Sequence, residues 1–406
     1  MKSSSRRILA YGRYWLQRIE QVPDNEPLPD TDIRSVARAL EMLISLDGHK
    51  EAWDITKRLG KKIHLFLERQ GYWEEWTLFL GKLQETAHRY EDKESEAEWL
   101  FQLGSLFNQR RLQSDALSAL RQSFFLFSQG KNKSGRAKTY SDLANLYRQK
   151  GYFQRAEILC QEAIRLSETL EDSIRLAIAH NHMGYILLDQ AKWEAAEYHL
   201  ATSVSGLEKA EQYSYFLAKT LQNSGTLYLQ MGHLDRAQAA LNKAITLYQQ
   251  SGDQVYVARS LLCIGAVQAQ SNNILQAYEV VKQAEHLLNM YGGEAVDFGE
   301  TYHNLGLIET ELKNWQSSEA YFKRALQIWT TLPDDWNKAN TILDLTALYI
   351  AKQDKPLAKH YALEAELLLN QHLESHFHTL REALAQHKTD IFMLKESNRM
   401  SMVREG

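Results

Sequence analysis

The sequence predicts an all-α protein: a right-handed α-solenoid of about eight helical hairpins with a C-terminal capping helix. Three observations predict it. A small residue recurs every 40 or 41 residues along most of the chain. A second set of small residues follows these by 12 positions. The composition, with five prolines in 406 residues, 44% hydrophobic and 24% charged residues, is typical of an ordered helical protein.

The stretch 220–245 shows the repeating unit most clearly. Gly225 and its apolar neighbours share one face of a first helix, Gly232 opens a turn, and Ala237 begins the inner face of a second helix. Because Gly225 and Ala237 are small, we expect the two helices to cross closely at these positions.

Residues 1–31 form a basic segment followed by a linker that contains Pro23, Pro27 and Pro29. The basic part has the spacing of a short amphipathic helix. Three interpretations remain open for it: a solvated terminal helix or disordered arm, a docking segment for an acidic partner, or an organelle transit peptide.

Residues 32–95 are predicted to hold degenerate helices that cap the array. An amphipathic helix is expected over 32–46. In the first repeat, His64, Trp76 and Leu83 replace the small residues found later. A terminal repeat that departs from the pattern is expected of a cap.

Residues 96–370 form the regular array. The reference position, defined by Gly225, recurs at 40- or 41-residue intervals at His64, Gly104, Ala144, Gly184, Gly225, Gly265, Gly306 and Thr346. The small position of the second helix holds Trp76, Ala116, Ala156, Ala196, Ala237, Ala277, Ser318 and Ala358. Residues 371–406 are predicted to be a capping helix over 371–397 and a frayed tail.

The net charge of −4 gives no reason to expect general binding to nucleic acid or to an anionic membrane. Cys160 and Cys263 lie in different repeats, which suits reduced thiols better than a disulfide. No uninterrupted apolar run approaches 18 residues. We therefore expect a cytoplasmic protein without membrane insertion.

The sequence carries no recognisable catalytic, cofactor or metal motif, so we expect no enzyme activity and no cofactor. His372 and His376 are four residues apart on the predicted terminal helix, but a metal site there would lack assured third and fourth ligands. His180 and His182 are expected to have structural roles, one near the core and one near the groove.

The pattern resembles the tetratricopeptide repeat, whose signature is visible in LANLYRQKGYFQRAEILCQEAI and YHNLGLIETELKNWQSSEAYFKRAL. The resemblance spans about residues 60–370. The usual period is about 34 residues, so this chain is similar to the long-period type attached to signalling ATPases or found in adaptor proteins. The extra residues are expected between hairpins, for example in QGKNKSGR.

The first helices of such an array are expected to line a concave groove that binds a protein or peptide. Residues three before, one after and four after the reference position should face it. With lysine and arginine residues that can reach in from one edge, the predicted groove residues are Lys138, Ser141, Asn145, Arg148, Asn181, Tyr185, Lys219, Gln222, Asn223, Thr226, Arg259 and His303. Asparagines there could bond a peptide backbone, while the cations select acidic groups.

Asn145, Lys219 and Asn223 resemble parts of the two-carboxylate clamp of some tetratricopeptide proteins, but Ser141 stands where the first lysine is expected. A second candidate surface is basic and contains Arg110, Arg111, Lys131, Lys133, Arg136, Lys138, Lys150 and Arg155. It lacks interleaved aromatic residues, so an acidic protein or plain solvation fits it better than nucleic acid.

These observations predict a non-catalytic scaffold or adaptor that binds a protein or peptide in its groove and regulates a partner. Whether it is a subunit of a larger complex stays open at this point. The alternative is a peptide- or ligand-responsive sensor that controls an enzyme, a signalling ATPase or a transcription factor. The two alternatives differ in whether binding changes the shape of the array.

Overall fold

The computed structural model describes residues 3–23, 28–69, 72–210, 213–332, 334–372 and 377–394, and within these ranges every regular element is a helix. The predicted all-α class is confirmed. The chain divides into two compact units, each described here by itself. Unit 1 comprises Met1–Cys263 with Leu287–Gly293, and unit 2 comprises Ile264–His286 with Glu294–Gly406. The domain limits drawn from the sequence remain predictions.

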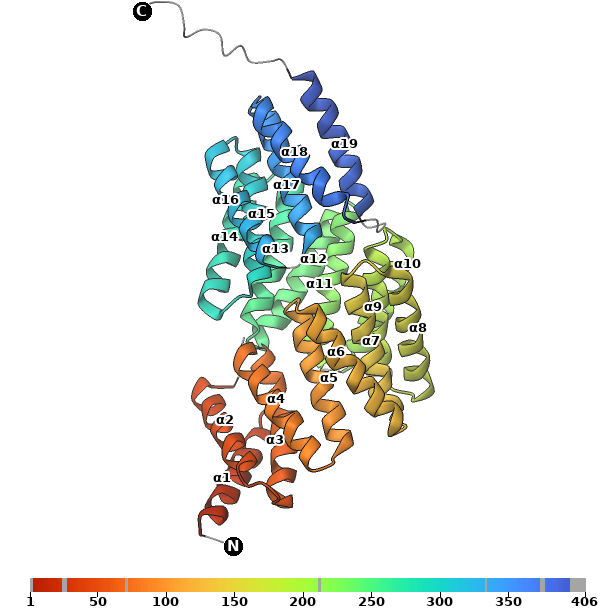
Figure 1. Ribbon diagram of the computed structural model, residues 1–406, viewed down its shortest axis with the longest axis vertical. Helices are drawn as coiled ribbons and strands as arrows, with labels where there is room; N and C mark the ends of the chain where they lie inside the picture. The colour runs from red at the N-terminus through yellow and green to blue at the C-terminus, as the bar shows by residue number, and fades with distance from the viewer. Residues whose placement is uncertain are drawn as a thin grey trace, which may run out of the picture. The chain divides into compact units, whose positions relative to one another are not determined.

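Four helices begin unit 1: α1 (Ser3–Glu20), α2 (Asp30–Ile44), α3 (Lys50–Arg69) and α4 (Trp73–Arg89) (Figure 1). Helix α1 packs on α2 and α3. Its buried side chains include Trp15, Leu16 and Ile19, and Arg18 pairs with Asp32 at 2.7 Å. The expected helix is therefore present, but the interpretation as a solvated or disordered arm is wrong, because an apolar stripe holds the helix to its neighbours.

In the degenerate first repeat, α3 and α4 are joined at their crossing by a hydrogen bond between two large residues, where later repeats have small residues. Trp76 is fully buried and its Nε1 donates to Nδ1 of His64 at 2.8 Å. Helices α3 and α4 thus keep the hairpin arrangement although both reference residues are large.

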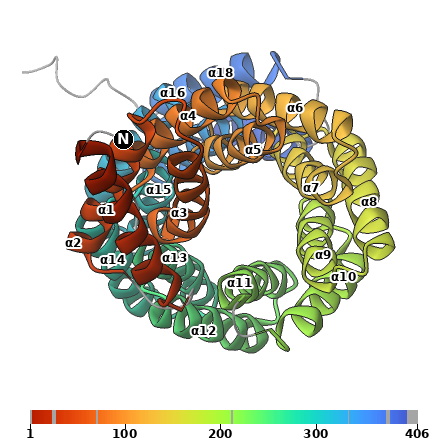
Figure 2. The same cartoon turned by 90° about the horizontal axis from the view of Figure 1, so that it is seen from below.

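The regular hairpins of unit 1 pair a first helix with a second helix in antiparallel fashion. They are α5 (Lys93–Gln109) with α6 (Gln113–Gln129), α7 (Lys133–Gln149) with α8 (Phe153–Thr169), α9 (Ser173–Leu188) with α10 (Trp193–Leu207), and α11 (Ser214–Gln230) with α12 (Leu234–Gln250). Within unit 1, the first helices α7, α9 and α11 lie on the inside of a curve and α8, α10 and α12 on the outside (Figure 2).

The long period comes from long helices. Helices α5 to α8 each have 17 residues, and the joints between them have only three, as in 110–112 and 130–132. Asp92, Asn132 and Asp172 end three joints by accepting a hydrogen bond from the backbone N–H three residues on. The polar segments between hairpins that the sequence assigned to the surplus, such as QGKNKSGR, hold a three-residue joint and the ends of these longer helices.

The reference glycines make room for one large residue of the second helix, 16 positions on. A Cβ atom on Gly225 would lie 2.6 Å from Cγ of Leu241, and one on Gly306 would lie 2.6 Å from Cδ1 of Phe322. Where the reference residue is Ala144, the residue 16 positions on is the small Cys160. The close crossing predicted from the sequence is confirmed, and its two partners are matched in volume.

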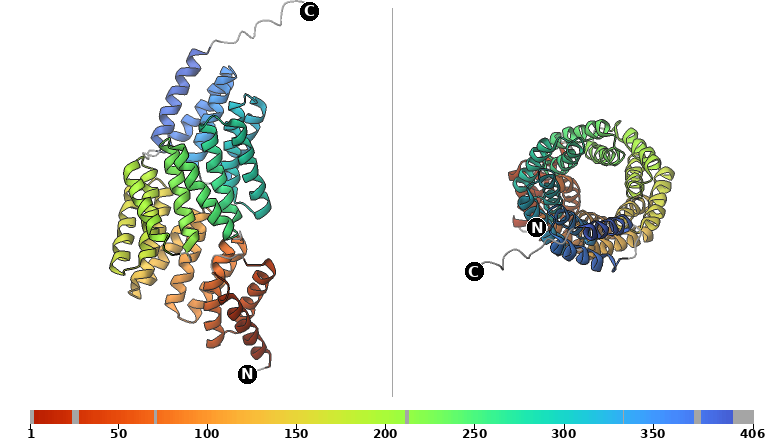
Figure 3. Two further views of the ribbon diagram at one scale, coloured as in Figure 1. Left: turned by 180° about the vertical axis from the view of Figure 1, so that it is seen from behind. Right: turned by 90° about the horizontal axis from the view of Figure 1, so that it is seen from above.

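Unit 2 contains α15 (Ala295–Glu311), α16 (Trp315–Thr331), α17 (Asp335–Ala351), α18 (Lys355–Leu369) and α19 (His378–Met393), whereas α13 (Gln254–Gln270) and α14 (Ile274–Tyr291) contribute to both units. Its core includes Phe322, Tyr349 and Phe377. Helix α19, the darkest blue helix in Figure 3, packs on α17 and α18. The predicted helix over 371–397 is shorter in the structure, because Gln371 and His372 follow the end of α18 and α19 begins at His378. Residues 395–406 lie outside the described residues.

Candidate functional site

The predicted groove residues of unit 1 meet each other between neighbouring first helices. The amide Nδ2 of Asn223 on α11 donates to Oδ1 of Asn181 on α9 at 2.8 Å. His182 on α9 hydrogen-bonds to the backbone of Ser141 on α7. In both pairs a residue three before the reference position meets a residue two before it on the next first helix. We call this face of α7, α9 and α11 the inner face of unit 1.

Arg148 is the central charged group of the inner face. Its side chain is 9% exposed. Its Nε donates to Oδ1 of Asn145 at 3.1 Å, its Nη1 pairs with Asp189, and its guanidinium carbon lies 4.0 Å from the centre of the Tyr185 ring. Burial lowers the pKa of Arg148, but Asp189 and Tyr185 outweigh that effect and raise it. The guanidinium is therefore held rigidly and stays charged.

His182 on α9 lies near positive charges from two neighbouring helices. Burial and, to a smaller extent, the charges of Lys219 on α11 and Arg148 on α7 lower its pKa to about 3. The imidazole is thus neutral near pH 7. The predicted split of the two histidines is seen here, since His180 is buried and its Nδ1 lies 2.8 Å from Nδ1 of His199 on α10.

The predicted inner-face residues fall into two classes by burial. Ser141, Arg148, Asn181 and Asn223 are buried, so they position their neighbours. The half-buried residues are the ones that a ligand can touch, and they are Asn145, Tyr185, Lys219, Gln222 and Thr226. Two of these also bond within the fold: Gln222 accepts from the hydroxyl of Tyr248 at 3.2 Å, and Thr226 donates to the Gln222 carbonyl at 3.2 Å.

Two of the predicted cations are engaged elsewhere. The Nζ atom of Lys138 lies 2.6 Å from both carboxylate oxygens of Glu98 and 4.1 Å from the centre of the Phe101 ring. Burial lowers the pKa of Lys138, although Glu98 opposes the shift. Arg259 on α13 lies 5.5 Å from the centre of the Trp73 ring. Lys219 on α11 is half-buried, and its charge acts on His182 of the inner face.

The contact of Arg259 belongs to a link that closes unit 1 on itself. The hydroxyl of Tyr256 donates to Oε1 of Gln109 at 3.3 Å, joining residues 147 positions apart. The Arg259 guanidinium also lies 4.8 Å from the centre of the Tyr256 ring. We call these residues of α13, α4 and α5 the closing contact.

His303, the one predicted groove residue in unit 2, repeats the register of the Asn181 pair with different chemistry. It lies three before its reference position on α15, and its Nε2 atom lies 3.3 Å from Oδ2 of Asp344 on α17. Asp344 is two before its own reference position, as Asn223 is. Sequence reasoning missed Asp344 and Asp189, and it did not say which of His180 and His182 lies near the groove. The position two before the reference is the signal that would have identified Asp344 and His182.

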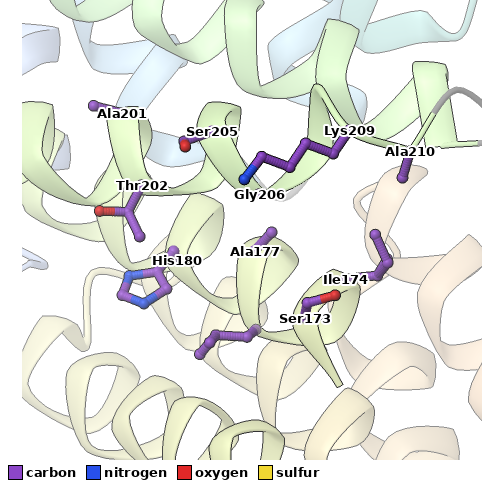
Figure 4. Close-up of a pocket in the computed structure, with 11 residues that line it drawn as sticks. Ser173, Ile174, Ala177, His180, Ala201, Thr202, Ser205, Gly206, Lys209 and Ala210 are labelled. Atoms are coloured by element: carbon purple, nitrogen blue, oxygen red, sulfur yellow. The ribbon is translucent and has the colours of Figure 1, made fainter. Parts of the chain in front are cut away.

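A shallow hollow of about 650 Å³ opens between α9 and α10 (Figure 4). It is lined by Ser173, Ile174, Leu176, Ala177, His180, Ala201, Thr202, Ser205, Gly206, Lys209 and Ala210. None of the predicted groove residues lines it. Its walls are mostly small and apolar, and Lys209 reaches across its mouth (Figure 4).

The remaining sequence candidates have ordinary surroundings. Cys160 is buried and donates to the carbonyl of Ala179, and burial raises the pKa of its thiol. His372 pairs with Asp335, whereas His376 lies outside the described residues. Within the described part of the chain, no cluster of three or more histidine, cysteine, aspartate or glutamate residues could hold a metal ion.

The basic surface predicted between neighbouring repeats is partly neutralised. Arg110 pairs with Glu74 at 3.5 Å, and Lys138 pairs with Glu98 as described above. Arg136 and Arg155 stack over the rings of Phe124 and Tyr147. No helix in the described residues is long and apolar enough to cross a membrane.

Comparison with solved structures shows similar folds. A Rap protein complexed with Competence and Sporulation Factor is 14% identical, with a TM-score of 0.58, over 81% of this chain and 99% of that one. The apo form of the quorum sensor NprR from B. thuringiensis is 13% identical, with a TM-score of 0.55, over 89% and 98%. Aspartyl phosphate phosphatase F from Bacillus subtilis is 16% identical, with a TM-score of 0.54, over 92% and 96%. At these identities the likeness is one of fold.

Family profiles give the sequence-level finding. Profiles described as tetratricopeptide repeat match residues 136–171, 218–251 and 297–369. These segments cover α7 with α8, α11 with α12, and α15 to α18. No curated protein sequence matches the chain. With its periodic hairpins, its glycine crossings and these three matches, the chain contains tetratricopeptide repeats.

Proposed function

We propose that the inner face of unit 1 binds an extended protein or peptide segment that carries an acidic group, and that the chain acts as a non-catalytic adaptor or regulator. The observation that carries this proposal is the convergence of Asn145, His182 and Lys219 from three successive first helices around the rigid Arg148 guanidinium. Amides bond a peptide backbone without selecting a side chain, and the surrounding cations favour a carboxylate.

Burial decides which residues should carry the contact. Asn181 and Asn223 bond each other and lie below the surface, so they fix the spacing of α9 and α11. Lys219 is half-buried on the same face and supplies a positive charge that lowers the pKa of His182. Lys219 is therefore the residue we expect to select an acidic ligand.

A random dodecapeptide display library selected on the wild-type protein tests the proposal. We expect enriched peptides to contain aspartate or glutamate, and fluorescence anisotropy to show about tenfold weaker binding to Lys219→Gln, the loss of one charge-assisted contact. Lys243→Gln is the matched control, because Lys243 is exposed on the second helix α12. Equal binding to Lys219→Gln and wild type would overturn the assignment.

A second candidate function, a ligand-responsive sensor, is favoured by the closing contact. The Tyr256–Gln109 hydrogen bond and the Arg259–Trp73 contact hold the curve of unit 1 across 147 and 186 residues of sequence. A ligand that changes the pitch of the inner face would strain or relieve this contact. The similar NprR structure is named a quorum sensor and the similar Rap structure is a complex with Competence and Sporulation Factor, which supports the same idea.

The two candidates are separated by a distance measurement within unit 1. Spin labels at Ser114→Cys and Gln250→Cys, in a Cys263→Ser background with Cys160 left buried, report the separation of α6 and the end of α12. A sensor predicts that a selected peptide shifts this distance by several ångströms, whereas an adaptor predicts an unchanged distance. The free thiols suit the reducing cytoplasm, where we expect the protein to act.

A further inference from the structure

Four polar side chains of unit 2 form a cluster between α15 and α17. His303 Nδ1 lies 3.0 Å from the Thr341 hydroxyl, and His303 Nε2 lies 3.4 Å from the amide of Asn340 and 3.3 Å from Oδ2 of Asp344. His303 and Asp344 are 14% and 27% exposed, respectively, so the cluster is enclosed but can be reached from outside.

The neutral ring of His303 carries a single hydrogen, so it can donate either to the Thr341 hydroxyl from Nδ1 or to the Asp344 carboxylate from Nε2. In neither tautomer does the imidazole bring a positive charge to Asp344. The Thr341 hydroxyl and the Asn340 amide are neutral as well. The cluster therefore supplies no positive charge to pair with the Asp344 carboxylate.

Nothing else in the described part of unit 2 supplies that charge. Asp344 has no lysine or arginine partner among the described residues. Burial alone raises its pKa to about 7, and burial also lowers the pKa of His303 to about 4, so the imidazole does not become the missing cation near neutral pH. One carboxylate beside a neutral imidazole is a poor metal site, and no group of three metal-binding side chains is present in the described ranges.

An organic cation fits the cluster better than a metal ion. A primary ammonium has three N–H donors, so it can bond the Asp344 carboxylate and still donate to the amide oxygen of Asn340. Leu307 lies one helical turn beyond His303 on the same face of α15 and is 40% exposed, so it offers an apolar surface to the aliphatic stem of such a group. An alkylammonium group therefore matches the negative charge of Asp344, the hydrogen-bond acceptors of the cluster and the apolar surface of Leu307.

We propose that His303, Asn340 and Asp344 form a binding site for an alkylammonium group, such as a lysine side chain of a partner, with its aliphatic stem against Leu307. This site goes beyond the proposed function of unit 1. It lies in unit 2, it takes the opposite charge, and it does not depend on Lys219 or Arg148.

Histidine-selective NMR of the full chain tests the site. Nα-acetyl-lysine amide is expected to shift the His303 ring signals in a saturable way with a millimolar dissociation constant, while the neutral isostere Nα-acetyl-norleucine amide leaves them unchanged. Putrescine is the third arm. Tighter binding of putrescine than of the lysine amide would assign the site to free polyamines, and the reverse order to protein side chains.

The variant Asp344→Asn keeps the shape of the side chain and removes its charge, so we expect at least about tenfold weaker binding of the lysine amide. Glu311→Gln is the matched control, because Glu311 is an exposed carboxylate on the same helix α15. Unchanged affinity in Asp344→Asn, equal loss in Glu311→Gln, or saturable binding of the norleucine amide would each overturn the proposal. So would the absence of any His303 shift in the wild type.

Discussion

The inner face of unit 1 and the His303–Asp344 cluster of unit 2 use the same register but opposite charge. In unit 1, Asn181 meets Asn223 beside Arg148 and Lys219. In unit 2, the equivalent positions hold a histidine and an aspartate that lacks a cation among the described residues. The repeat therefore determines where side chains on neighbouring first helices come into contact. The residues at those positions determine the charge of the ligand that each site should bind.

The largest effect should come from the scaffold that both regions share. Leucine at Gly225 in unit 1 or at Gly306 in unit 2 should destabilise its hairpin by about 3 kcal/mol, because even a Cβ atom would overlap Leu241 or Phe322. Hydrogen exchange of peptides from each hairpin measures the cost. Gly81→Leu is the control, since a Cβ atom there has nothing within 4 Å. A large difference between the two hairpins would contradict a common scaffold.

A smaller effect should follow from removal of a positive charge from the inner face of unit 1. Arg148→Met leaves Asp189 without its buried partner and should destabilise unit 1 by about 1.5 kcal/mol, less than for a fully buried pair because Asp189 is 26% exposed. Arg165→Met removes an ion pair whose members are 60% and 40% exposed, so it should cost at most about 0.5 kcal/mol. Urea unfolding of the two variants compares them, and similar costs would show that Arg148 is not held as described.

A dependence of stability on pH should appear on the negatively charged side of the comparison, at the His303–Asp344 cluster. Burial raises the pKa of Asp344 from 3.8 to about 7, so the folded state favours the protonated form. The resulting stability is present below about pH 4 and is lost as the pH rises towards 7. Relative to Asp344→Asn, which keeps all other titrating groups, the wild type should lose stability through this range.

Urea midpoints of the wild type and Asp344→Asn between pH 5 and 7.5 measure this difference. We expect the midpoint of Asp344→Asn to rise relative to that of the wild type as the pH increases. A constant difference would mean that Asp344 is charged throughout, with a cation beside it. Addition of Nα-acetyl-lysine amide should reduce the difference, because a bound cation compensates the carboxylate.

The helices and their crossings could be predicted because sequence spacing reports them directly. Gly225 and Ala237 mark a contact within one hairpin, and such contacts depend only on helical geometry. The turns were harder. Arg111, Ala191 and Lys313 adopt positive φ angles near 60° at the position that Gly232 occupies in its own hairpin. The two packed helices impose this conformation, so the positive φ angle cannot be predicted from the residue type.

The inner-face pairs were predicted only in part because they join different hairpins. A helical count places Asn181 and His303 on the groove side, but it does not tell how far one first helix is rotated against the next. The structure shows that rotation through the Asn181–Asn223 and His303–Asp344 pairs. Burial also separates residues of one predicted stripe, since Asn181 is covered whereas Tyr185 is half-buried. Neither property can be read from spacing alone.

The matched volumes at the helix crossings have a consequence for how such a chain can change over time. Leu241 lies against Gly225, Phe322 lies against Gly306, and Ala362 stands 16 positions after Thr346, so each large residue is balanced by a smaller one inside its own hairpin. A genetic duplication or deletion of one whole unit carries both members of the balance with it. The chain can therefore be lengthened or shortened by complete hairpins without compensating mutations at these crossings. An exchange of half a hairpin that placed Phe322 opposite Thr346 would remove the space that Gly306 provides for its ring.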